Sequence, residues 1–176
     1  GQPLHHAITL LQQALEAGGR ARPTEVTYNS VLKACERAAK AGVREAAQVA
    51  LSLLRAMVAS SDPRMAPSNH TMSTVVRVCA ADGSEAALRG GRKAVRYLCT
   101  KARLVPDAHT VSACLQLYVA AGDANRFLTM VLPQLVACGA QPQRDAFFRQ
   151  QLLHRYGEAT ARRVVAELAA QEGRKA

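Results

Sequence analysis

The chain has 176 residues, 49% of them hydrophobic and 20% charged, and its 23 Lys and Arg against 13 Asp and Glu give a formal net charge of +10. This composition supplies a packed core and excludes an intrinsically disordered chain. It contains no apolar run of the roughly 20 residues that a membrane-spanning helix needs, so no membrane contact is expected.

The positive charge is typical of a protein with a polyanionic partner, chiefly nucleic acid, although a solvated basic surface or an acidic protein partner stays open. Aromatic residues make up only 4%, and there is no Trp. Small helix-forming residues dominate instead, which favours helices packed on helices over a β-sheet core. The chain opens on Gly1 with no initiator Met and no recognisable signal or transit peptide, and we expect a mature or trimmed product.

The segment 5–24, "HHAITLLQQALEAGGRARPT", indicates the second helix of a preceding helical pair. A helix is then predicted from Thr24 or Thr27 to about Ala41, because apolar residues recur at three- and four-residue spacing and Gly42 follows. A second helix is predicted over 44–60, and the two prolines of "SSDPRMAPS" end this pair.

The second pair is predicted as a helix ending at Gly83 and another over 84–104 that is interrupted or begins late at Gly90–Gly91. The third pair covers 108–123 and 124–139, with Pro133 expected to kink its second helix. The fourth covers 144–157 and 158–173, and Phe147 with Phe148 is expected to seal the end of the core.

Equivalent helix starts place Asn29, Ser73, Ser112 and Phe148 in register, at steps of 44, 39 and 36 residues. Helical hairpins that recur at such a period indicate an all-α fold, an α-solenoid in which each hairpin buries its apolar face against its neighbours. The predicted units, all in one solenoid domain, are 1–24, 25–68, 69–107, 108–143 and 144–176.

The five cysteines form no C-x-x-C pair and are scattered, so neither a disulfide framework nor a zinc site is expected. Cys35 and Cys79 occupy equivalent helix positions and are predicted to be core residues. We expect no metal and no cofactor. The chain also shows no paired carboxylates, Gly-rich phosphate loop or nucleophile motif, so we expect no catalytic residues and no enzyme.

The repeated phrases resemble the pentatricopeptide repeat (PPR) family, in a degenerate form with about three full repeats, a partial N-terminal one and a terminal helical pair. "EVTYNSVLKAC", "AG", "ALSLLRAM" and "APS" follow the order of the family's unit, as do "HTMSTVVRVC", "ADG" and "LVPD", and then "HTVSACLQLYVAAGD" and "CGAQP". The tetratricopeptide repeat is the nearest rival, but its Trp-containing first helix is absent here.

The resemblance implies single-stranded RNA bound along the first helices, with one base met by each unit. Two polar residues of a unit select the base, and a third helps to sandwich it. The implied sets are Asn29 with Ser68 and Val26, Ser73 with Asp107 and His70, and Ser112 with Gln143 and His109. In the fourth unit Phe148 and Asp145 form no recognised pair.

Helical spacing adds cations to this predicted surface. Lys33 and Arg37 follow Asn29 on one helix face, and Arg77 follows Ser73, which suits a base contact with a phosphate contact one turn later. Gln116 echoes the pattern after Ser112. A separate basic cluster for structured RNA is predicted at Arg89, Arg92, Lys93 and Arg96. The alternative is that these are solvated surface residues and that His70 and His109 only belong to helix starts.

Together these features predict a non-catalytic RNA-binding helical-repeat protein of organelle gene expression, in a mitochondrion rather than a chloroplast. Few units, long insertions and a weak base code favour a structural part of a large ribonucleoprotein, such as an organellar ribosome, with protein neighbours. The alternatives are a transcript-specific factor for RNA processing, stability or translation, and a tetratricopeptide-like protein scaffold without RNA contact.

Overall fold

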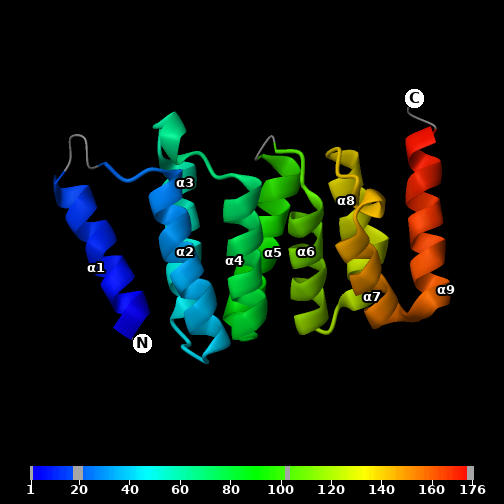
Figure 1. Ribbon diagram of the computed structural model, residues 1–176, viewed down its shortest axis with the longest axis horizontal. Coiled ribbons are helices and arrows are strands. Elements are labelled where there is room, and N and C mark those ends of the chain that lie inside the picture. The colour runs from blue at the N-terminus through cyan, green and yellow to red at the C-terminus, as the bar shows by residue number, and fades with distance from the viewer. Residues whose placement is uncertain (1, 18–21, 102–103, 174–176) are drawn as a thin grey trace.

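The computed structural model describes residues 2–17, 22–101 and 104–173, with side chains described from residue 4 to residue 170 within those ranges. In these ranges the regular structure is entirely helical. Figure 1 shows the helices standing side by side in one row, from α1 at one end to α9 at the other. The predicted all-α solenoid is confirmed.

The first helices of the successive pairs begin at similar phrases of sequence. A side chain caps most of these starts: Asp107 Oδ1 accepts a hydrogen bond from the backbone N–H of Thr110 at 2.7 Å, and Ser68 Oγ accepts one from Thr71 at 3.3 Å. These helices are α2 (Glu25–Lys40), α4 (Asn69–Asp82), α6 (Ala108–Ala120) and α9 (Ala146–Gly173).

The second helices run back along the first, after turns at glycines such as Gly42 and Gly83 with positive φ. They are α3 (Ala46–Ala59), α5 (Glu85–Thr100) and a composite of α7 (Ala124–Arg126), the π-helical η3 (Phe127–Val131) and α8 (Leu132–Ala137). Helix α1 (Gln2–Ala17) precedes them, and the short 3₁₀ helices η2 (Pro63–Met65) and η4 (Pro142–Arg144) lie in connections.

A threonine in the first turn ties α4 and α6 each to the preceding first helix. Thr71 Oγ1 donates a hydrogen bond to Asn29 Oδ1 at 2.8 Å, which joins α4 to α2. Thr110 Oγ1 donates to the backbone oxygen of Asn69 at 3.3 Å, which joins α6 to α4. The repeated phrase therefore contributes both a helix start and a link between neighbouring hairpins.

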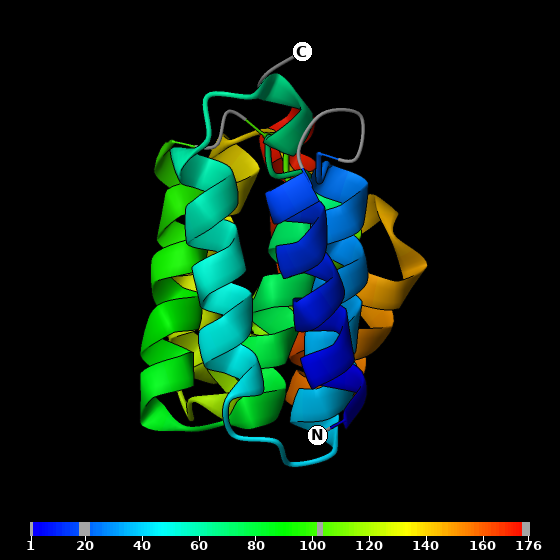
Figure 2. The same cartoon turned by 90° about the vertical axis from the view of Figure 1, so that its left-hand side faces the viewer.

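The helices form two layers. Helix α4 packs extensively against both α2 and α6, and α9 continues this row against α6, whereas α3 and α5 meet over a much smaller contact. Figure 2 looks along the row and separates α3 and α5 on one side from α2 on the other. The layer of first helices is therefore packed more closely than the layer of second helices.

The core runs between the layers through the whole row. Helix α4 is buried almost all round, including Met72, Val75 and Val76. Cys35 and Cys79 are fully buried, as predicted from their equivalent helix positions. Burial raises the pKa of the Cys35 thiol to about 11 and that of Cys79 to about 12, which keeps both thiols protonated and unreactive.

The break predicted at Gly90–Gly91 is wrong, because α5 runs without interruption from Glu85 to Thr100. The two glycines serve packing instead. A Cβ atom on Gly91 would lie 2.7 Å from Leu117 Cδ1 and 3.0 Å from Cys79 Cβ, so only glycine lets α5 approach α4 and α6 this closely.

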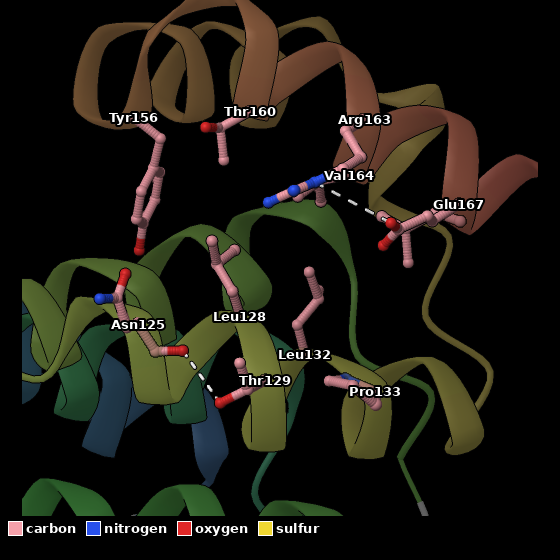
Figure 3. A pocket seen from close by; sticks show the side chains of 11 residues that line it. Asn125, Leu128, Thr129, Leu132, Pro133, Tyr156, Thr160, Arg163, Val164 and Glu167 are labelled. Atoms are coloured by element: carbon pink, nitrogen blue, oxygen red, sulfur yellow. Dashed lines mark hydrogen bonds and ion pairs between the residues drawn. The ribbon is translucent and has the colours of Figure 1, made fainter.

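The expected distortion near Pro133 takes the form of the π-helical turn η3. The backbone N–H of Leu132 bonds to the oxygen of Phe127, five residues back, and Pro133 follows without an N–H of its own. Figure 3 shows Pro133 and Leu132 at the edge of a cavity that this segment shares with α9.

The last helical pair is divided as predicted, since Gly157 lies inside α9 with φ 78° and ψ 169°. Phe148 is fully buried and seals the core, but Phe147 is 42% exposed, so the prediction holds for only one of the two rings. Helices α2–α3, α4–α5 and α6–α8 fall within the predicted units 25–68, 69–107 and 108–143, and the unit boundaries themselves stay a prediction.

Candidate nucleic-acid interface

Two exposed cations stand one turn apart on α2. Lys33 and Arg37 are both solvent-exposed and face away from the buried stripe of this helix. Among the described residues, no carboxylate lies within ion-pair distance of either one. Both charges are therefore accessible to a phosphate, and their contact with RNA stays a prediction.

Arg77 is the cation of α4 that was expected to contact a phosphate, but its guanidinium already binds other side chains of this protein. Its Nε lies 3.1 Å from Glu36 Oε1 on α2, and its Nη2 donates to Thr74 Oγ1 at 3.1 Å. Lys40 Nζ reaches the same Glu36 oxygen at 2.9 Å. Arg77 is thus first a link between α2 and α4, and a phosphate contact would have to compete with Glu36.

The two cations also set the charge state of Glu36. Burial by itself raises the pKa of this carboxyl, but hydrogen bonds from Lys40 and Arg77 and their positive charges outweigh burial. The pKa consequently lies below its ordinary value of 4.5, and Glu36 is ionised at neutral pH.

Asn29 and Ser68, the first predicted selector pair, are brought together by Glu25. Glu25 Oε1 accepts hydrogen bonds from Asn29 Nδ2 at 2.6 Å and from Ser68 Oγ at 2.5 Å, while Asn29 Oδ1 accepts one from Thr71. Both residues are half-buried. An amide has two N–H donors, so Asn29 retains one donor for a base beyond this network.

Ser73 and Ser112 are not on the surface, which corrects the prediction that they face a groove. Only 3% of Ser73 and 1% of Ser112 is exposed, because the close packing of α4 between α2 and α6 encloses them. Ser73 Oγ donates to the backbone oxygen of His70 at 3.1 Å, whereas Ser112 Oγ has no hydrogen-bond partner among the described residues. Neither hydroxyl can touch a base without movement of its neighbours.

The remaining predicted selector positions differ from one another. Asp107 is exposed, and its carboxylate caps α6. Gln143 is buried in η4, and its Oε1 has no hydrogen-bond partner in the part of the chain that the structure describes. Gln116 is half-buried on α6. Only Asp107 therefore presents its polar group to solvent without rearrangement.

The predicted sandwich residues form an exposed series at the starts of the first helices. Val26 is 71% exposed, and His70 and His109 are exposed too, each two residues after the residue that precedes its helix. Asp145 precedes α9, and its Oδ1 accepts from the N–H of Phe148 at 2.8 Å, which puts Phe147 at the matching place. Its ring lies 6.2 Å from that of His109, centroid to centroid.

Phe147 and Gln150 are thus candidate residues that the sequence alignment missed. It placed Phe148 opposite Asn29, but the cap at Asp145 puts Gln150, which is exposed, at that position. The signal was present in the sequence, because an Asp before an apolar run is a common helix cap.

Within the basic cluster of α5, one of the four cations is held by neighbouring side chains. Arg92 Nη2 bonds Asp123 Oδ2 at 2.8 Å and the guanidinium lies 5.9 Å from the centre of the Tyr118 ring, so this cation is bound to its neighbours. Arg89 pairs with Glu85 at 3.2 Å, while Lys93 and Arg96 are exposed. All four lie on the second-helix layer, not beside Lys33.

The described residues include no group of three or more His, Cys, Asp or Glu side chains placed to hold a metal ion. None of the described helices combines the length and apolar character needed to cross a bilayer. The first-helix side carries exposed cations, exposed rings and the amides of Asn29 and Gln150.

Stacked helical hairpins with this first-helix surface define a helical-repeat protein with a candidate RNA interface. The family model described as the pentacotripeptide-repeat region of PRORP matches residues 2–162, and the chain belongs to this pentatricopeptide-repeat family. Comparison with curated proteins and with solved structures gave no match. Family membership indicates an RNA-binding helical-repeat protein, and proteins of this kind are generally organellar.

Proposed function

We propose that this protein is a non-catalytic RNA-binding component of organelle gene expression that acts as a structural part of a large ribonucleoprotein, such as a mitochondrial ribosome. The burial of Ser73 and Ser112 carries this choice. A transcript-specific factor needs a series of accessible base-selecting side chains, and two of the three selectors predicted on the first helices, Ser73 and Ser112, are enclosed. Contacts to phosphates and exposed rings, by contrast, suit folded RNA of varied sequence.

The cations of α2 supply the contact that makes this binding measurable. Lys33 and Arg37 have no described carboxylate partner and stand one turn apart. Each phosphate contact with single-stranded RNA adds about 0.7 to the slope of log affinity against log salt concentration. We expect Lys33→Glu with Arg37→Glu to weaken RNA binding and to lower that slope by about 1.4.

The matched control is Arg44→Glu with Arg126→Glu, because both of these arginines are exposed, lie away from α2's outer face and give the same change of net charge. Filter binding would compare structured ribosomal RNA fragments with a pool of short single-stranded RNAs. A strong preference for one short sequence would favour the transcript-specific alternative. Equal losses in the two variants, or no binding at low salt, would contradict an RNA surface on α2 and favour a protein scaffold.

A further inference from the structure

We propose that the groove between α3 and α5 binds an amphipathic helix of another protein, whose apolar side chains are flanked by Asp or Glu. This groove lies on the second-helix layer and is separate from the candidate RNA surface on α2. The inference goes beyond the proposed function and does not depend on it.

The groove exists because the second helices spread apart where the first helices pack tightly. It encloses about 520 Å³. Gly90 has no Cβ atom, and an ideal Cβ at this position would lie only 2.3 Å from Leu51 Cδ1. Leu51 therefore packs directly against the α5 backbone and forms the floor of the groove. Leu54 is buried beside it, and Val58 is 41% exposed at the edge.

Small side chains keep the groove open. Ala59 of α3 and Ala86 of α5 are exposed and line it, as does the buried Ala94. The lining of α3 extends from Leu51 to Ala59, which is about 12 Å along a helix, or a little over two turns. A helix that places leucines at three- and four-residue spacing has the shape to fill such a depression between two helices.

The charges around the groove all have one sign. Arg55 from α3 and Arg89 and Lys93 from α5 line it, and no acidic residue does. Arg89 is paired with Glu85, and Arg55 Nη2 donates to Ser52 Oγ at 3.0 Å. In the described part of the chain no carboxylate lies within ion-pair distance of Arg55 or Lys93, so a carboxylate-bearing partner completes this rim.

Two other grooves, both next to α9, lack this combination. The cavity of Figure 3, between η3–α8 and α9, is lined by both Arg163 and Glu167, whose charged groups lie 4.0 Å apart. The groove within α9 is lined by Glu158 as well as by Arg149 and Arg162. Only between α3 and α5, among these three, does an apolar floor meet a wholly cationic rim.

This combination favours a protein over RNA as the occupant. Phosphates would use the cations but leave Leu51 and Val58 in contact with water. A protein helix buries that apolar floor and meets the cations with carboxylates, which is the usual anatomy of a protein interface. The groove offers a base only the half-buried Tyr97 as an aromatic surface.

Selection from a phage-displayed library of random peptides of about 12 residues, each about 18 Å long as a helix, tests the proposal. The library is selected on the whole chain and counter-selected on Arg55→Glu with Lys93→Glu. We expect enrichment of peptides that combine large apolar residues with Asp or Glu. No enrichment over the counter-selection, or enrichment of basic peptides, would overturn the proposal.

The affinities of a selected peptide then separate floor from rim. By fluorescence anisotropy we expect Arg55→Glu with Lys93→Glu to weaken binding by about tenfold or more and Arg44→Glu with Arg126→Glu to change it little. Ala86→Leu fills the groove without a change of charge and is also expected to weaken it. Equal weakening of peptide binding in both charge variants would contradict the proposed site.

The same variants distinguish this inference from the RNA hypothesis. Arg55→Glu with Lys93→Glu should bind RNA as well as the control variant of equal charge does. Lys33→Glu with Arg37→Glu should keep full affinity for the peptide. If RNA displaces the peptide, or if the groove variant loses more RNA affinity than the control, the groove is a nucleic-acid surface and the proposal fails.

Discussion

Glu36 is the residue through which charge ties α2 to α4. Its carboxylate is largely buried and accepts from both Arg77 and Lys40. Because these partners lower its pKa, the stability that it contributes is present above the ordinary pKa of 4.5 and is lost as the pH falls through the lower folded value. We expect Glu36→Gln to cost about 1 kcal/mol near pH 7 and progressively less as the pH falls below 4.5.

Thermal unfolding of the wild type and of Glu36→Gln across this pH range measures the difference in stability between them. Glu85→Gln is the matched control, since Glu85 also pairs with an arginine but is exposed, and exposed pairs contribute little. A gap between wild type and Glu36→Gln that stays constant down to the lowest pH would show that the carboxylate's charge is not what joins the helices.

At this scale the sequence predicts a helix start better than the depth of a side chain. Thr24, one of the two cap residues predicted for the first helix, does precede α2, because a short polar side chain before an apolar run favours a helix start, which is a local rule. Whether Ser73 faces a groove or a neighbouring helix depends on how closely α4 and α6 approach. That distance is set by side chains far away in the sequence, so a local pattern cannot give it.

Helix α5 shows the same limit for whole elements. Two adjacent glycines look like a break, since glycine disfavours helix, but here they allow close packing. At Gly91 a Cβ atom would meet Leu117 and Cys79, both fully buried. At Gly90 it would meet the tip of Leu51, which is half-buried in the floor of the α3–α5 groove and can rotate away.

Alanine at each position therefore has a different expected effect. Gly91→Ala should lower the free energy of unfolding by about 1–3 kcal/mol, because the core cannot make room. Gly90→Ala should be neutral or stabilising by up to about 1 kcal/mol, because helix propensity improves and only a side chain must shift. Urea unfolding of the pair measures both. Similar losses at the two positions would show that α5 is constrained at Leu51 as tightly as in the core.

Across the whole molecule, the repeating phrase predicted the architecture because it acts at every hairpin. Each copy supplies a helix start, and Thr71 and Thr110 link their helices to the preceding one. The fourth copy was misaligned because its start is written as "RDAFF", without that threonine. The candidate site was predicted where it depends on a helix face, at Lys33 and Arg37, and missed where packing encloses or occupies side chains, at Ser112 and Arg77.

A row of hairpins also predicts how stability is distributed along the chain. Each hairpin contacts only its neighbours, so central elements gain support from two sides and terminal ones from one. Helix α4 packs against α2, α3, α5 and α6, whereas α1 packs chiefly against α2. Helix α9 leaves Leu153 and other apolar residues exposed. We expect the slowest amide hydrogen exchange in α4 and α6 and much faster exchange in α1 and in the part of α9 after Gly157. Hydrogen–deuterium exchange resolved by peptide measures this order directly, and uniform protection from α1 to α9 would mean that the chain unfolds as one cooperative unit in spite of its repeats.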